Sequence, residues 1–445
     1  MNDIRSEVLK LAWPAMLEMI LHMFLSMIDT AMVSRLGAGA LSATALAGQI
    51  YWSVAFVTGA LGVGTTALAA RAYGARDYTE FSRVAHEGVA LAILGGISGF
   101  CILRASCTVL PGLISMDSEV ELLAMEYIQV MSFGLPPFVV WMVGNAVMRS
   151  GGDAVSPLIV AAIANSLNVV GDWILIFGKL RMPAMGVRGA ALASVVSLYV
   201  AALLSLNGLA RNGLGFCSVL RGRWSWRWST VKELISLSVP ASFETILSDG
   251  ARSVQMVIMS SLGKFEFAAH QIAVTCESLS FMPGYGFAVA STVLVGQRLG
   301  ARERERAHAS AMECMRLSLL TMGAIGLLFI FVPSSFTRVF TDDLQVLVPA
   351  SRVLRIAGYI QPFIGMTDTL AGALRGAGDT RSPLRITALG GWLVRIPLTL
   401  IAVRVLGWSL ISVWVINGLE WVLKAVLCWN VFRSWDWSPE RGVEG

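Results

Sequence analysis

Three polar side chains within long apolar stretches of the sequence have the chemistry to bind a proton or a small cation. Asp29 lies in the first of these stretches, and Asn168 and Asp172 lie in a later one. Asn168 and Asp172 are four residues apart, so on a helix they would share one face. A carboxylate with an amide one turn away can hold a proton, or a small cation together with water. The alternative interpretation is that these groups only make hydrogen bonds that hold helices together.

The first apolar stretch also contains an acidic residue and a proline that could couple binding to movement. Glu18 precedes Asp29 by eleven residues, which places both on one helix face. Pro14, inside a helix, would remove one backbone hydrogen bond and clash with the carbonyl group of Lys10. The helix is therefore either easily bent at Pro14 or held in a static kink. Glu18, one turn later, is either a gate residue or a hydrated side chain.

Further ionisable residues lie in or near the later apolar stretches. An ionised side chain at the bilayer centre costs about 2.5–3.5 kcal/mol on insertion scales, so each one is a candidate for a functional role. Asp249 and Arg252, three residues apart, would pair on a helix. Arg395 would pair with either Asp368 or Glu420. The secondary candidates for the ion site are Glu18, Glu244, Asp249, Glu277 and Asp368.

The composition identifies the elements that must hold these side chains. The chain has 445 residues, of which 14% are charged and 56% are hydrophobic, and its mean hydropathy is +0.68. Soluble domains typically have about 25% charged residues. The apolar stretches are continuous rather than alternating, and each approaches or exceeds the ~20 residues that a helix needs to cross a bilayer. We therefore expect an all-α integral membrane protein, which excludes a cytosolic enzyme, a secreted disulfide scaffold and a nucleic-acid-binding domain.

Twelve membrane-spanning helices are expected. Their predicted ranges are 7–34, 44–72, 84–110, 120–148, 156–178, 186–210, 231–262, 266–298, 308–334, 346–374, 383–406 and 409–433. Lysine and arginine are concentrated in the loops after the second, sixth, eighth and tenth helices. Because basic loops stay on the cytoplasmic side, we expect a multi-pass protein of the inner (plasma) membrane with both termini in the cytoplasm.

The two halves of the sequence repeat one another at a single fixed separation, that of Pro14 from Pro240. We call this separation the repeat offset. Further motifs that match at the same offset are 74–77 with 300–303, and 149–153 with 375–379. An even number of helices in each half makes the repeats parallel. We therefore expect two pseudo-symmetric six-helix lobes, 1–210 and 231–445, joined by a cytoplasmic linker at 211–230. This is the architecture of transporters that expose a central site alternately to either side.

The candidate ion-binding residues do not follow this repeat. At the repeat offset, Asp29, Asn168 and Asp172 are replaced by Gln255, Val394 and Leu398. The second half has its own acidic residues, but at other positions. The sequence therefore favours an ion site in the first lobe.

Several motifs together resemble those of the multidrug and toxic compound extrusion (MATE) family of secondary transporters. They are Pro14 followed by Ile28-Asp-Thr30, Asn168-Val-Val-Gly-Asp172, Gly186-Val-Arg-Gly-Ala-Ala-Leu-Ala-Ser194 and Leu374-Arg-Gly-Ala-Gly-Asp-Thr-Arg381. The resemblance implies twelve helices in two lobes, with a central cleft that opens alternately to either side. It also implies export of organic cations and amphipathic drugs in exchange for protons or sodium.

Within that family, the first-lobe motif is most similar to the branch of the DNA-damage-inducible F-like proteins. This resemblance implies a cation site made of Asp29, Asn168 and Asp172, with Asn145 and Ser194 as helpers. Pro14 would be the bending proline of the first helix. Another branch carries a glutamate on helix 7 and an aspartate on helix 10, where this chain has Ser248 and Ile364. The first-lobe assignment is therefore favoured.

We expect the protein to export its substrate by exchange with a cation. A carboxyl group held away from water favours its protonated form, and its protonation and deprotonation would favour different arrangements of the two lobes. No enzymatic activity, metal or organic cofactor is expected, and the coupling ion would be a proton or sodium. The partners would be a small cationic or amphipathic substrate and the lipid bilayer, without nucleic acid, and the protein would act as a monomer.

Two other functions stay open. A lipid-linked glycan flippase of the same superfamily would need a basic groove for pyrophosphate, and few arginines beyond Arg252 and Arg395 lie in the predicted spans. An integral-membrane transferase would need a metal-binding pair of acids. The only adjacent pair, Asp342 and Asp343, falls in a predicted extracytoplasmic loop without a partner motif.

Overall fold

The structure is a computed structural model that describes residues 2–113, 117–211 and 226–435. The described residues form helices and loops without a strand. Ten helical segments within them are long and apolar enough to cross a membrane. Two more, α10 (Trp228–Ser260) and α14 (Leu344–Gly376), have 33 residues each but a more polar composition. Together they confirm the predicted all-α membrane fold with twelve spans.

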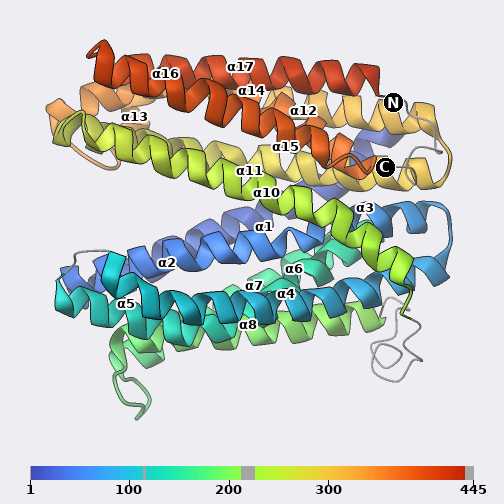
Figure 1. Cartoon of the computed structure of the whole chain (residues 1–445), viewed down its shortest axis with the longest axis horizontal. Helices are drawn as coiled ribbons and strands as arrows, with labels where there is room; N and C mark the ends of the chain where they lie inside the picture. The colour runs from blue at the N-terminus through green and yellow to red at the C-terminus, as the bar shows by residue number, and fades with distance from the viewer. Residues whose placement is uncertain (1, 114–116, 212–225, 436–445) are drawn as a thin grey trace. The chain divides into compact units, whose positions relative to one another are not determined.

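The first six spans follow the predicted order (Figure 1). They are α1 (Asn2–Ser34), α2 with α3 (Ala38–Gly59, Leu61–Gly74), α4 (Tyr78–Leu113), α5 with η1 and α6 (Ser118–Met131, Ser132–Gly134, Leu135–Ser150), α7 (Val155–Phe177) and α8 (Gly186–Arg211). The most buried of them is α6, which packs against α3, α4 and α8. A helix with neighbours on several sides must be apolar over most of its circumference, as α6 is.

The last six spans repeat this order. After α10 they are α11 (Lys264–Gly300), α12 (Arg304–Phe331), α14, then α15, η2, α16 and η3 (Arg381–Ala388, Leu389–Arg395, Ile396–Leu400, Ile401–Val405), and α17 (Leu410–Ser434). A short helix, α13 (Pro333–Thr337), follows α12. The segments η2 and η3 are π-helices, which interrupt the eleventh span.

Packing divides the chain into two compact units. The N-unit comprises Leu17–Ser242, and the C-unit comprises Met1–Met16 together with Phe243–Gly445. The division falls inside α1 and α10, just after Pro14 and Pro240. The lobes predicted from the repeat, 1–210 and 231–445, differ from these units by the ends of the two helices. Most of the predicted linker at 211–230 lies outside the described residues.

Backbone geometry supports the repeat. Gly37 and Gly263 lie at the loops after α1 and α10 and have φ of 112° and 117°. Arg76 and Arg302 lie at the next loop of each half and have φ of 57° and 61°. The members of each pair are separated by the repeat offset, so the two halves share the conformation of their loops as well as their sequence.

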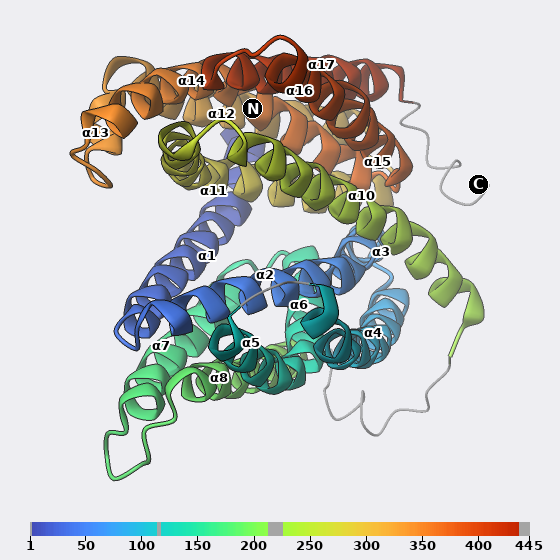
Figure 2. The ribbon, with the colours of Figure 1, turned by 60° about the vertical axis from the view of Figure 1, so that its left-hand side comes forward.

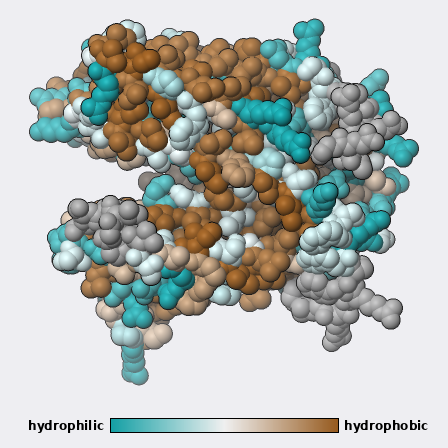
Figure 3. Space-filling model, in the orientation of Figure 1, coloured by the Kyte–Doolittle hydropathy of each residue, from teal (hydrophilic) through white to brown (hydrophobic). Residues whose placement is uncertain are grey.

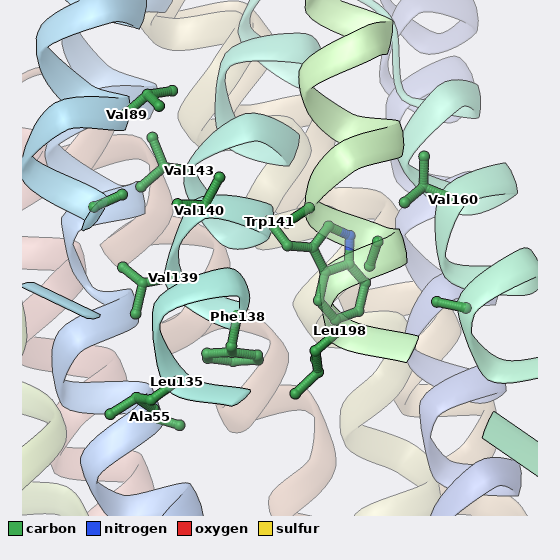
Figure 4. Close-up of a cluster of buried hydrophobic side chains, with 14 of the residues drawn as sticks. Ala55, Val89, Leu135, Phe138, Val139, Val140, Trp141, Val143, Val160 and Leu198 are labelled. Carbon is green, nitrogen blue, oxygen red and sulfur yellow. The ribbon is translucent and has the colours of Figure 1, made fainter. Parts of the chain in front are cut away.

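Apolar side chains form the interior of the N-unit. Figure 4 shows Phe138 and Trp141 of α6 between neighbouring helices, with Leu198 and Val160 close by. Large apolar side chains also cover long stretches of the outer helix faces (Figure 3). Leu203 and Phe331 are among the exposed apolar side chains. A soluble protein rarely exposes so much contiguous apolar surface, but a surface that faces lipid requires it.

Helix packing in the C-unit depends on glycine. α14 packs against α11, α12 and α17. A Cβ atom at Gly358 of α14 would lie 2.6 Å from the carbonyl oxygen of Gly326 in α12, and one at Gly326 would clash equally with the carbonyl oxygen of Gly358. The two backbones therefore touch, which is the packing that small residues permit between membrane helices.

Replacement of Gly326 tests this contact. We expect Gly326→Ala to lower the free energy of unfolding by about 1–3 kcal/mol, because the added methyl group forces α12 and α14 apart. Gly323→Ala is the matched control on the same helix, since nothing lies within 4 Å of its Cβ position. Thermal unfolding in detergent measures both variants, and equal melting temperatures for the two would contradict the prediction.

Candidate cation site

The structure brings four of the predicted residues together in the N-unit. Asp29 comes from α1, Asn168 and Asp172 come from α7, and Ser194 comes from α8. The carboxyl groups of Asp29 and Asp172 lie close enough to interact with each other. We call these four residues the Asp29–Asp172 site.

Asn168 connects the carboxyl pair to α8. With its amide oriented to satisfy both ends, Nδ2 donates to Asp29 Oδ1 at 3.2 Å, and the amide oxygen accepts from the hydroxyl and the backbone N–H of Ser194, both at 3.1 Å. Asn168 is 1% exposed. One amide therefore ties three helices together at the site.

Local sequence explains why these helices approach so closely. Asn168 and Asp172 are one turn apart on α7, so both face the same side of the helix. Gly171 lies between them, where a Cβ atom would be 2.9 Å from Ala193 Cβ, and Gly189 of α8 packs on the carbonyl oxygen of Leu175. α7 and α8 lie side by side in Figures 1 and 2.

The electrostatics of the carboxyl pair require a proton or a cation. Asp172 is 1% exposed, and neither of its carboxyl oxygens has a hydrogen-bond donor among the described residues. Two ionised carboxylates only accept hydrogen bonds and repel each other. One proton shared between Asp29 and Asp172, or one small cation held by both, removes that repulsion.

Tyr127 of α5 also lies beside the two carboxyl groups, and the sequence did not single it out. Its ring packs against an apolar cluster that includes Val33 and Ile176. A lone tyrosine in an apolar span carries no distinguishing sequence signal.

Asn145 does not lie with the other predicted residues but in a second polar cluster of the N-unit. Its Nδ2 donates to Glu18 Oε1 at 3.1 Å, and Ser205 donates to its Oδ1 at 2.8 Å. Arg149 Nη2 donates to the two carboxylate oxygens of Glu18 at 3.0 and 2.9 Å. We call these four residues the Glu18 cluster. All four are buried.

The ion pair of the Glu18 cluster has a counterpart in the C-unit. Glu244 of α10 accepts from Arg375 Nη2 at 2.7 Å and from the hydroxyl of Thr387 at 3.4 Å. The repeat offset relates Glu18 to Glu244, and it also relates Arg149 to Arg375. The sequence pointed to the glutamates but not to their partners, although both arginines lie in the repeated motifs 149–153 and 375–379.

The other secondary candidates lie in the C-unit. Asp249 pairs with Arg252 at 2.5 Å on the surface of α10. The nearest charged groups to Glu277 are Arg395 and Arg252, and those nearest to Asp368 include Arg375 and Lys424. Among the described residues, no three histidine, cysteine or acidic side chains are grouped so that they could hold a metal ion.

Comparison with known proteins places this geometry in a family. The family model MatE matches residues 14–174 and again 240–401, so its two copies begin one repeat offset apart. The chain is 32% identical to a probable multidrug resistance protein NorM of Thermotoga maritima, over 98% of this chain and 94% of that protein.

Solved structures share the fold. One is described as the outward-facing conformation of a multidrug resistance MATE family transporter of the MOP superfamily. Another is a MOP superfamily transporter from Pyrococcus furiosus. Each has a TM-score of 0.88 and 22% sequence identity, and the match covers 97% of this chain and 95% of the other.

Proposed function

Because the chain belongs to the MATE family, we propose that it is a secondary transporter that exports organic cations or amphipathic drugs in exchange for protons or sodium. The names of its relatives support multidrug export. The observation that carries the proposal is the pair of facing carboxyl groups of Asp29 and Asp172 in the N-unit.

The carboxyl pair gives the exchange a physical basis. When a proton joins the pair, the local negative charge falls and the site loses its attraction for a cationic substrate. When the proton leaves, the carboxylates repel each other until another cation neutralises them. Exchange follows if the protonated and deprotonated pairs favour different conformations of the protein.

Asp29 links the site to the first helix. α1 continues through Pro14, and its part from Leu17 onward packs in the N-unit. A change in the carboxyl pair therefore acts directly on a helix with a weakened hydrogen-bond ladder. Whether Pro14 bends during transport or only fixes a kink stays a prediction.

Sodium is the alternative coupling ion. The two carboxylates present oxygen ligands of the kind that hard cations prefer, but Asn168 turns its Nδ2 toward Asp29 and its oxygen toward Ser194. A proton satisfies the pair without a change in the positions of these side chains, whereas a sodium ion needs its ligands to surround it. We therefore place the proton first.

The paired arginines argue against a flippase. A groove that binds pyrophosphate needs basic side chains that are available to the ligand. Arg149, Arg375 and Arg395, which lie in spans, each contact a carboxylate of their own unit.

The basic loops after the second, sixth, eighth and tenth spans support cytoplasmic termini in the inner membrane.

Transport in proteoliposomes tests the proposed exchange. We expect a pH gradient alone, with no sodium present, to drive accumulation of a fluorescent organic cation on the acidic side. An imposed sodium gradient at equal pH is the matched comparison, and liposomes without protein are the blank. Transport driven by sodium alone would replace the proton with sodium as the coupling ion. No transport with either gradient would refute the proposed function.

A further inference from the structure

A buried group of charged side chains in the C-unit has no role in the proposed exchange. It comprises Arg395 at the end of η2 and Glu420 and Lys424 of α17, which we call the Glu420 cluster. Arg395 Nε donates to Glu420 Oε2, and Lys424 Nζ lies 2.5 Å from Glu420 Oε1. Glu420 is 0% exposed, Lys424 6% and Arg395 8%. Each carboxylate oxygen thus has a cation of its own.

The π-helix explains how Arg395 reaches this position. By the repeat offset, Asn168 corresponds to Val394, the residue before Arg395. A π-helix closes its hydrogen bonds from i to i+5 and so contains one more residue per turn than an α-helix. The extra residue in η2 rotates Arg395 onto the face that Asn168 occupies in α7. Accordingly, Asn168 contacts α8 and Arg395 contacts α17.

A glycine lets the two spans approach. A Cβ atom at Gly390 of η2 would lie 2.6 Å from Lys424 Cε and 3.2 Å from Glu420 Cγ. The corresponding position of α7 is Ala164, in a regular helix. The side chains of Glu420 and Lys424 therefore pack directly over the backbone of the π-helix.

The two repeats differ in the charged groups that they carry at the positions of the Asp29–Asp172 site. In the N-unit, α1 and α7 contribute two carboxyl groups, Asp29 and Asp172. In the C-unit the position of Asp29 is taken by Gln255, which donates to Asn417 Oδ1 of α17 at 2.7 Å. The position of Asn168 is taken by a guanidinium group. The C-unit thus lacks the carboxyl pair and has a guanidinium group at the position of Asn168.

The charged residues around the Glu420 cluster leave Glu420 in contact with its two cations. Asp368 of α14 lies near Lys424, and Glu277 of α11 lies near Arg395. Arg375 is paired with Glu244. No other cation among these neighbours contacts Glu420. Both oxygens of the Glu420 carboxylate are thus in contact with a buried cation, which leaves no room for a further small ion.

We propose that the Glu420 cluster is the C-unit's counterpart of the Asp29–Asp172 site, in which Arg395 and Lys424 act as built-in cations. In this arrangement the two cations prevent Glu420 from binding a proton. The proposal rests on the proposed function of the Asp29–Asp172 site as the half that exchanges cations. Removal of the built-in cations converts Glu420 into a carboxyl group that binds and releases a proton.

Labelling with dicyclohexylcarbodiimide tests this, because the reagent adds to protonated carboxyl groups in apolar surroundings. The purified full-length protein in detergent is labelled at one pH, and modified peptides are quantified by mass spectrometry. In the wild type we expect labelling of Asp29 or Asp172 and none of Glu420. In Lys424→Met we expect labelling of Glu420 at least about tenfold faster than in wild type, and faster still in Lys424→Met/Arg395→Met. Lys424→Arg keeps the charge and should behave as wild type.

The outcomes separate the two proposals. Labelling of Glu420 in the wild type, or no increase in Lys424→Met, would overturn the blocked site. Lys424→Met keeps the pair of Arg395 with Glu420, so this comparison remains available if the double variant does not fold. Absence of label at both Asp29 and Asp172 would count against the proposed function instead, and the comparison at Glu420 would still stand.

Discussion

Asp29→Asn and Asp172→Asn are each expected to abolish export while the protein stays folded in the membrane. Asparagine has nearly the shape of aspartate but can neither ionise nor carry a shared proton. The variant pair could then no longer alternate between a protonated and a deprotonated form. Coupling requires two such states that differ in ligand binding. Efflux of a fluorescent organic cation from cells measures the effect, normalised to the amount of protein in the membrane.

Asp249→Asn is the matched control for these variants. Asp249 is also an acidic residue of a membrane helix, but it pairs with Arg252, whose side chain is 65% exposed, and an exposed pair contributes little. We expect it to keep most of the activity. Full export by both Asp29→Asn and Asp172→Asn would refute the Asp29–Asp172 site, and equal loss in the control would show that charge in general is responsible.

The residues of the Asp29–Asp172 site could be singled out from the sequence because polar side chains are expensive to place in a membrane. Asp29, Asn168 and Asp172 stand out against apolar neighbours, and the four-residue spacing of Asn168 and Asp172 defines a helix face. The contact partner Ser194 came only from the family resemblance. Ten of the twelve spans stand out equally, because length and apolar composition define them, whereas α10 and α14 have a more polar composition.

The Glu18 cluster was less visible, because it depends on where two helices end. α6 extends to Ser150 and α14 to Gly376, so Arg149 and Arg375 lie in the last turn of a span, where Arg149 reaches the buried Glu18 and Arg375 the half-buried Glu244. From the sequence alone, Arg375 belongs to a predicted basic loop and Arg149 only to a repeated motif. Asn145 lies one turn before Arg149 on α6 and therefore faces Glu18 as well.

The π-helix could not be predicted from composition. η2 contains Gly390 and Gly391 next to each other, but two glycines in a span indicate close packing more often than a change of helix type. The repeat offset alone aligned Asn168 with Val394, and only the wider turn shows that Arg395 takes that face. The sequence repeat therefore matched the right helices, but at this point it aligned Asn168 with the residue before Arg395.

The buried ion pair of the Glu18 cluster should give the largest effect on stability. We expect Glu18→Gln and Arg149→Met each to lower the free energy of unfolding by about 3–5 kcal/mol, because each leaves a buried charge without its partner. Glu18 and Arg149 are 3% and 8% exposed, so water replaces the lost partner poorly. Thermal and denaturant unfolding of the purified protein measure the change.

The double variant Glu18→Gln/Arg149→Met separates pairing from simple loss of contacts. Since it removes both charges, we expect it to be more stable than the sum of the single effects predicts, which a double-mutant cycle measures directly. Glu244→Gln/Arg375→Met is the matched cycle at the repeated position of the C-unit, where a smaller coupling is expected because that pair is less buried. Strictly additive effects in the N-unit would show that Glu18 and Arg149 do not act as a pair. The transport assay on the double variant then shows whether the restored packing also restores export, as it should if the pair holds α1 in place beyond Pro14 and carries no ion itself.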